Sequence, residues 1–126
     1  MDGAVKYSIL VVDDEKPNLN VLHFILRRDY VVYLAKDGQT ALDLAEEYQP
    51  DLILLDIILP DLDGYEVITR LKTSERTKDI PVIFITGLNS DKDMEKGLQL
   101  GAADYIAKPF SAGIVLGKVR QQISGT

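Results

Sequence analysis

Five polar residues follow directly on apolar stretches of the sequence, and their types could together hold a metal ion and a phosphoryl group. Asp13 and Asp14 follow the run SILVV, and Asp56 follows DLILL. Thr86 follows PVIFI, and Lys108 follows ADYIA. If the fold brings these positions together, three carboxylates, one hydroxyl and one ammonium share a single pocket.

Three carboxylates in one pocket repel one another and strain the site when nothing balances their charge. A hard divalent cation removes this conflict, and Mg²⁺ prefers carboxylate oxygens, a backbone carbonyl and several waters. Histidine and cysteine are missing from these positions, which argues against zinc or copper. The residue types therefore predict a Mg²⁺ site.

The same residues suit phosphoryl chemistry. An ammonium beside a metal clamps the oxygens of a transferring phosphoryl group, which is the role predicted for Lys108. Asp56 can act as the nucleophile and form an acyl phosphate. The Thr86 hydroxyl can donate a hydrogen bond to a phosphoryl oxygen.

The apolar runs before these residues are typical of strands in a parallel sheet. They are continuous rather than alternating, and rich in Val, Ile and Leu, as in strands covered on both faces. Helix-like stretches lie between them, so strand and helix alternate five times. The predicted strands are residues 8–12, 30–35, 51–55, 81–85 and 103–107, and the predicted helices are about 16–28, 38–48, 64–74, 91–100 and 112–123.

This alternation predicts an α/β fold, a doubly wound five-stranded parallel sheet with helices on both faces. The first strand is followed by DDEKPN rather than a Gly-rich turn, so the dinucleotide-binding fingerprint is absent. We therefore predict the flavodoxin-like strand order 2-1-3-4-5. Strand order then reverses between the first and third strands, where the polar residues at the carboxyl ends of the strands should meet.

Length and composition indicate one globular domain over residues 1–126, with its core at about 8–124. The net charge of −6 argues against direct binding to nucleic acid. The first residues, MDGAVKYS, lack the pattern of a secretory signal, and no apolar run approaches the length of a membrane span. We expect a cytoplasmic protein with no membrane contact.

The motifs, taken together, resemble the response regulator receiver domain of two-component signalling. The resemblance runs from about Ile9 to Ile123. It rests on the acidic pair in ILVVDDEKPN, the aspartate in DLILLDIILPDLDG, the threonine in PVIFITG and the lysine in GAADYIAKPF. It implies a phosphoacceptor switch that uses Mg²⁺ and is not an enzyme in its own right.

The resemblance also assigns roles to single residues. Asp56 is the implied phosphoacceptor and Lys108 its charge partner, and the implied metal ligands are Asp13, Asp14, Asp56 and the backbone carbonyl of Ile58. Thr86 and Tyr105 are the implied switch residues. The bond matching Lys108–Pro109 is cis in the family, and proline makes this conformation accessible.

The implied phosphoryl donor is a sensor histidine kinase or a histidine phosphotransfer protein, and the implied output is a downstream effector or an attached output domain. The stretches VDDEKPNLNVL and ERTKDIPVIFITG look most like receivers attached to cyclic-dinucleotide enzymes or hybrid kinases. An alternative is a receiver that binds partners independently of phosphorylation. A true aspartyl-phosphate hydrolase is disfavoured, because such enzymes carry an acid two residues after the nucleophile, where this chain has Ile58.

Four further residues have simpler interpretations. His23 is expected at the edge of the first helix, and a turn signal after Asp63 is enough to explain Gly64. Gly113 and Gly117 fall inside the last predicted helix, where each costs about 1 kcal/mol relative to alanine. Close packing, a looser helix and a partner surface all remain open for these two glycines.

Overall fold

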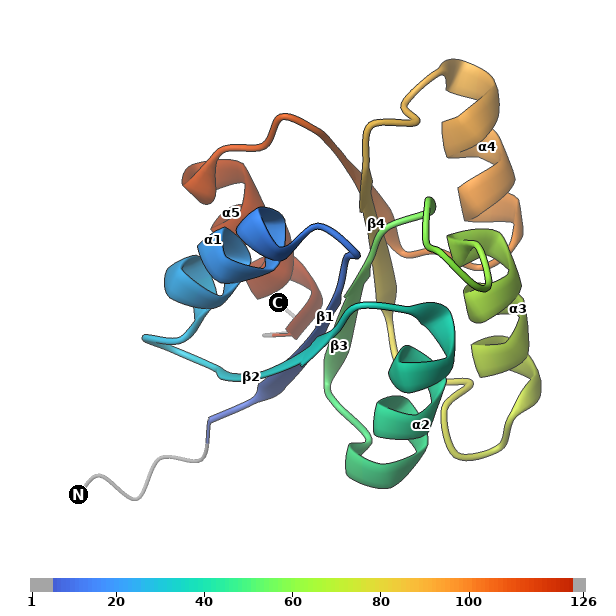
Figure 1. Cartoon of the computed structure of the whole chain (residues 1–126), viewed down its shortest axis with the longest axis horizontal. Coiled ribbons are helices and arrows are strands. Elements are labelled where there is room, and N and C mark those ends of the chain that lie inside the picture. The colour runs from blue at the N-terminus through green and yellow to red at the C-terminus, as the bar shows by residue number, and fades with distance from the viewer. Residues whose placement is uncertain (1–5, 124–126) are drawn as a thin grey trace.

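The computed structural model describes residues 6–123, so the last residue of the predicted core lies outside the described range. All ten predicted elements are present (Figure 1). The strands are β1 (Ser8–Val12), β2 (Val31–Ala35), β3 (Leu52–Leu55), β4 (Val82–Thr86) and β5 (Asp104–Ala107). The helices are α1 (Lys16–Leu26), α2 (Gly38–Tyr48), α3 (Gly64–Thr73), α4 (Asp91–Gln99) and α5 (Ala112–Ile123). Helices α1, α3 and α4 end one or two residues earlier than predicted.

The five strands form one parallel sheet in the order β2-β1-β3-β4-β5, which confirms the predicted topology. Helices α1 and α5 cover one face of the sheet, and α2, α3 and α4 cover the other (Figure 1). Val12 at the end of β1 pairs in register with Ala35 on one side and with Leu55 on the other. This register brings the ends of β1 and β3 level with each other.

The central strands are buried along nearly their whole length, as their uninterrupted apolar sequences predict. Successive residues alternate between the two layers of core. Leu10 and Val12 pack on the side of α2 and α3, whereas Ile9 and Val11 pack on the side of α1 and α5. Strand β2, at the edge of the sheet, is only partly buried.

The helix starts follow local sequence signals. Pro17 lies in the first turn of α1, where its missing N–H costs little. The Asp63 side chain accepts a hydrogen bond from Glu66 N at the start of α3. At the start of α4, Ser90 and Asp93 form a complete capping box. These caps explain why the helices begin where the sequence predicts.

The last helix is continuous through both of its glycines. A Cβ atom built on Gly113 or Gly117 would meet no atom within 4 Å among the described residues. Close packing within the described part of the chain is therefore the wrong explanation for these glycines. The buried residues of this helix are Val115 and Val119.

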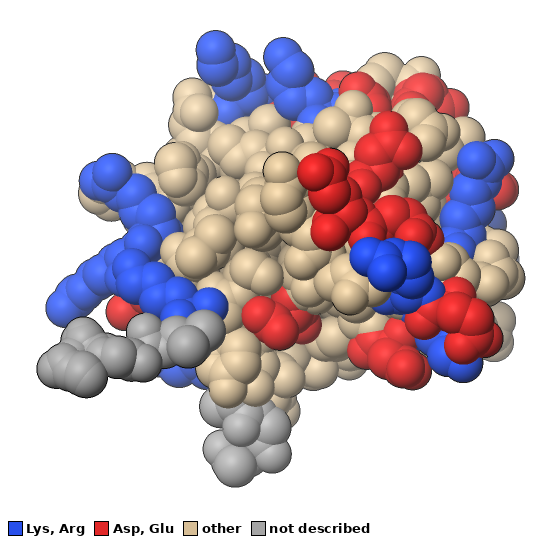
Figure 2. Space-filling model, turned by 90° about the horizontal axis from the view of Figure 1, so that it is seen from below, with Lys and Arg blue, Asp and Glu red and all other residues tan. Residues whose placement is uncertain are grey.

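Charge is distributed unevenly over the surface. Figure 2 shows basic side chains concentrated toward the side of α1 and α5, and acidic side chains concentrated toward the opposite side, with a few basic ones among them. Arg27, Arg28 and Arg120 line a groove between α1 and α5, next to the exposed ring of Phe24. Within residues 6–123, none of the helices is both long enough and apolar enough to cross a bilayer.

Candidate functional site

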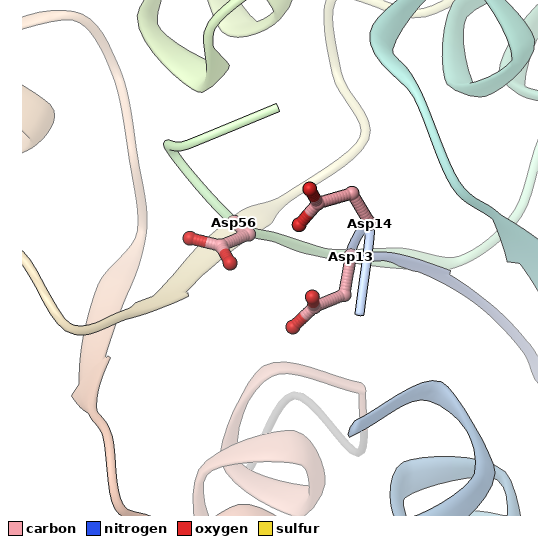
Figure 3. Close-up of side chains that lie close together, drawn as sticks. All are labelled: Asp13, Asp14 and Asp56. Atoms are coloured by element: carbon pink, nitrogen blue, oxygen red, sulfur yellow. The ribbon is translucent and has the colours of Figure 1, made fainter. Parts of the chain in front are cut away.

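The five polar residues singled out in the sequence meet at the carboxyl edge of the sheet. Asp13 and Asp14 follow β1, Asp56 follows β3, Thr86 ends β4 and Lys108 follows β5. One carboxylate oxygen from each of the three aspartates lies within 4.8 Å of the others. Figure 3 shows the three side chains close together at the adjacent ends of β1 and β3. The predicted convergence is therefore confirmed as geometry.

Lys108 links two of the aspartates. Its Nζ lies 2.7 Å from Asp13 Oδ2 and 2.8 Å from Asp56 Oδ2, and it lies 4.0 Å from Glu15 Oε1. Burial of the ammonium acts to lower the pKa of Lys108. The hydrogen bonds to Asp13 and Asp56 and the charges of these carboxylates outweigh burial and raise the pKa above its ordinary value. Lys108 is therefore held as a cation.

In both Asp13 and Asp56, one carboxylate oxygen accepts hydrogen bonds from the backbone and the other accepts from Lys108. Oδ1 of Asp13 accepts a hydrogen bond from Glu15 N at 2.9 Å, and Oδ1 of Asp56 accepts from Ile57 N at 2.7 Å and from Ile58 N at 3.3 Å. In each case Oδ2 faces Lys108. The backbone thus fixes the orientation of both buried carboxylates, whereas Asp14 is exposed.

A cavity of about 310 Å³ opens beside these groups. Its lining residues come from the carboxyl ends of four strands and the loops that follow them: Asp14, Glu15, Asp56, Ile58, Thr86, Gly87 and Lys108. Three carboxylates and one ammonium leave the site with an excess of negative charge. Every candidate metal-ligand atom of these carboxylates is an oxygen. This donor set fits a hard divalent cation such as Mg²⁺. Ile58 lies at this cavity with a side chain that is largely exposed, so its side chain is not needed for packing there.

Thr86 and Tyr105 are joined through the backbone of Leu88. The Thr86 hydroxyl is completely buried and accepts a hydrogen bond from Leu88 N at 3.3 Å. The Tyr105 hydroxyl donates to the carbonyl oxygen of Leu88. Burial of the phenol, together with the charges of Tyr65, Asp93 and Asp56, raises the pKa of Tyr105 to about 12. Tyr105 therefore lies inward and is held as a neutral phenol.

Helix α4 packs against aromatic rings of other elements and buries none of its own larger apolar side chains. Gly97 is its only buried residue, and a Cβ atom at that position would lie 2.9 Å from the Phe84 ring. The Phe84 ring lies 5.7 Å from that of Tyr65 and 6.0 Å from that of Tyr105, measured between centroids. The Lys96 ammonium lies 4.2 Å from the Tyr65 ring centroid. The position of α4 therefore depends on three rings next to the site.

Two residues near the site were not recognised from the sequence. A Cβ atom on Gly64 would lie 2.5 Å from the Asp56 carbonyl oxygen and 2.7 Å from Ile57 Cα, so this glycine is needed for close approach and not merely for a turn. The Asp61 carboxylate accepts hydrogen bonds from the first backbone amides of α2. The turn signal marked Gly64 without its reason, and no signal marked Asp61. His23 is exposed on α1, as expected.

Comparison with known proteins agrees with this geometry. The sequence model of the response regulator receiver domain matches residues 9–120. A probable cyclic di-GMP phosphodiesterase from Vibrio cholerae is 37% identical over 123 residues, which cover 98% of this chain but only 28% of that protein. The chain thus spans about a quarter of the length of this relative.

Two solved structures are similar over nearly the whole chain. One is the receiver domain of a sensor histidine kinase from Pseudomonas aeruginosa, described with a magnesium ion coordinated in its active site cleft. It is 35% identical with a TM-score of 0.88, over 95% of this chain and 99% of that one. The other is the BeF3-activated receiver domain of DrrB from Thermotoga maritima, which is 32% identical with a TM-score of 0.86 over the same shares. The chain therefore belongs to the response regulator receiver domain family of two-component systems.

Proposed function

We propose that this chain is a phosphoacceptor switch in which Asp56 receives a phosphoryl group in a Mg²⁺-dependent reaction. The observation that supports this most directly is the position of Lys108, whose ammonium forms ion pairs with both Asp13 and Asp56. A carboxylate oxygen of Asp14 lies within 4.8 Å of an oxygen of each of these two aspartates. The donor is a phosphohistidine on a sensor histidine kinase or a histidine phosphotransfer protein. Both donors are in keeping with the family.

In the proposed step, a carboxylate oxygen of Asp56 attacks phosphorus in line with the phosphorus–nitrogen bond of the donor. That bond breaks, and its electron pair returns to the imidazole nitrogen. Lys108 lies 2.8 Å from the attacking group, so its ammonium can move from the carboxylate to the new phosphoryl oxygens. The product is an aspartyl phosphate.

The proposed metal ligands are the carboxylates of Asp13, Asp14 and Asp56 and the backbone carbonyl of Ile58. When bound, Mg²⁺ would neutralise the excess negative charge of the site and that of the incoming phosphoryl group. The magnesium ion described in the active site cleft of the related Pseudomonas receiver supports this assignment. The oxygen-only donor set of this chain supports it independently.

The proposed response to phosphorylation begins at Thr86. Its hydroxyl accepts from Leu88 N and keeps one hydrogen, which it can donate to a phosphoryl oxygen. The Tyr105 hydroxyl donates a hydrogen bond to the Leu88 carbonyl oxygen. A movement of Thr86 can therefore be transmitted to the Tyr105 side chain through Leu88 alone. The output is a change in the surface formed by α4, β5 and α5.

We also propose that residues 1–126 form one receiver domain and that it acts in the cytoplasm. It assists only its own phosphorylation and dephosphorylation and needs a partner for output. The similarity to about a quarter of a probable cyclic di-GMP phosphodiesterase supports an attached or separate output domain of that kind. No direct contact with nucleic acid or membrane is part of this proposal.

Incubation with acetyl phosphate, with and without Mg²⁺, tests the proposal through the intact mass of the protein. The wild type should gain one phosphoryl group only with Mg²⁺, Asp56→Asn should gain none, and Asp29→Asn, an exposed control, should behave as the wild type. A gain that persists in Asp56→Asn would place the acceptor elsewhere. If calorimetry shows no Mg²⁺ binding by the wild type, the alternative of a phosphorylation-independent partner-binding receiver is favoured.

A further inference from the structure

The loop between β3 and α3 is tied to the start of α2 by Asp61. Its Oδ1 accepts a hydrogen bond from Gly38 N at 2.7 Å, and its Oδ2 accepts from Gln39 N at 2.9 Å. These amide donations lower the pKa of Asp61, so the carboxylate stays ionised. Both oxygens of one anion are thus used to hold the end of a helix that begins 23 residues earlier in the chain.

Helix α2 already has an N-cap of its own. Asp37 precedes the helix, and its side chain accepts a hydrogen bond from Thr40 N at 2.7 Å. The usual function of capping the first turn is therefore served locally. Asp61 satisfies the two amides that precede Thr40, and in doing so it joins two separate parts of the fold.

Packing supports the same connection. A Cβ atom on Gly38 would lie 2.9 Å from Leu62 Cβ and 3.2 Å from the Leu62 carbonyl oxygen. The start of α2 and the loop that follows Asp61 are therefore in direct contact. A glycine at the first position of the helix permits this contact, and the Asp61 hydrogen bonds lie beside it.

The loop held in this way also carries Ile58, three residues before Asp61. Its two ends are joined by a hydrogen bond of 2.7 Å from Gly64 N to the Ile57 carbonyl oxygen. Between these ends, Asp61 is the one residue whose side chain hydrogen-bonds to a different helix or strand within residues 6–123, since Asp63 bonds only Glu66 N in the helix that it begins. Asp61 therefore provides the side-chain hydrogen bonds that tie this loop to α2, beside the packing of Leu59 and Leu62 against the core.

We infer that Asp61 is a positioning residue for the metal site: by fixing the β3–α3 loop to α2, it holds the backbone carbonyl of Ile58 at the cavity. This inference rests on the proposed function, because Ile58 matters only if Mg²⁺ binds there. Mg²⁺ demands near-ideal octahedral geometry, so a small displacement of one ligand is sufficient to weaken binding. Asp61 itself does not touch the metal.

The test compares Asp61→Ala with Asp37→Ala, since both variants remove a carboxylate that caps α2. Calorimetry with Mg²⁺ alone should show that Asp61→Ala raises the Kd about tenfold, the lower end of the range for groups that orient metal ligands. Asp37→Ala should leave the Kd unchanged. Asp61→Asn keeps one acceptor for the helix amides and should give an intermediate Kd.

A second measurement does not depend on the metal. Without Mg²⁺, deuterium exchange of residues 57–63 should be faster in Asp61→Ala than in Asp37→Ala or the wild type. Equal exchange in the two alanine variants, or an unchanged Kd in Asp61→Ala, would show that Asp61 is only a helix cap and would overturn the inference. If the wild type itself fails to bind Mg²⁺, the proposed function fails, and the exchange data still decide whether Asp61 holds the loop.

Discussion

Replacement of Gly64 by alanine should disturb the fold and the site together. The added Cβ would lie 2.5 Å from the Asp56 carbonyl oxygen and 2.7 Å from Ile57 Cα. Both neighbours are backbone atoms at the end of β3, so neither can turn away as a side chain can. Ordinary contact needs about 3.5 Å, and the start of α3 must therefore move by about 1 Å.

The size of the effect follows from this overlap. Forcing an extra methyl group into a well-packed region costs about 1–3 kcal/mol, and contact with backbone atoms favours the upper part of that range. We expect Gly64→Ala to lose about 2–3 kcal/mol of unfolding free energy. With a urea m-value of about 2 kcal/mol per M, the midpoint of unfolding should fall by about 1–1.5 M.

Gly117→Ala is the matched control, because it is the same substitution in a place with free space. A Cβ atom on Gly117 meets no atom within 4 Å among the described residues, and the residue lies inside α5. This variant should gain about 1 kcal/mol from helix propensity, so the two substitutions should change stability in opposite directions.

Urea unfolding followed by circular dichroism measures both midpoints, and calorimetry measures Mg²⁺ binding. Gly64→Ala should also bind Mg²⁺ more weakly, since the backbone that the added methyl group would press against belongs to Asp56 and its neighbour. A Gly64→Ala midpoint equal to that of the wild type would refute the close-approach explanation. In that case the turn signal alone would account for this glycine.

Three further predictions concern the rest of the site. Gly97→Ala should lose about 1–2 kcal/mol of stability in urea unfolding, less than Gly64→Ala, because its Cβ meets the buried ring of Phe84 rather than backbone. Lys108→Met should lose about 3 kcal/mol in the same assay, since it leaves two buried carboxylates without their cation, and added Mg²⁺ should restore part of the loss. For Tyr105, a folded-state pKa of about 12 means that the neutral phenol stabilises the fold fully below pH 10, and that this contribution disappears as the pH rises toward 12. The stability of the wild type relative to Tyr105→Phe should therefore fall by about 2 kcal/mol between pH 10 and pH 12.

The architecture could be predicted because its signals are local. Strands buried on both faces need uninterrupted apolar runs, and polar residues at the strand ends mark one edge of the sheet. The sequence pattern alone therefore predicts that Asp13, Asp56 and Lys108 lie close together. The helix ends were less well predicted, since Arg27 and Ser74 are compatible with a helix and only the path of the following loop decides.

What the sequence could not show depends on distances between remote segments. Gly64 is required by backbone atoms just after β3, and Gly97 is required by the Phe84 ring on β4. Nothing near either glycine in the chain indicates this. Asp61 looks like an ordinary loop acid until Gly38 N is found 2.7 Å away. The bridge from Thr86 to Tyr105 through Leu88 also depends on two strands lying side by side. Such contacts are properties of the packed structure alone.

The uneven charge of the surface has a consequence for encounters in solution. With arginines along the groove between α1 and α5 and acidic groups on the far side, the domain has an electric dipole although its net charge is negative. The electric field of an approaching anionic molecule therefore turns the domain so that its α1–α5 side faces that molecule before any contact forms. Added salt shortens the range of this torque, so the orientation of such encounters becomes less selective as ionic strength increases.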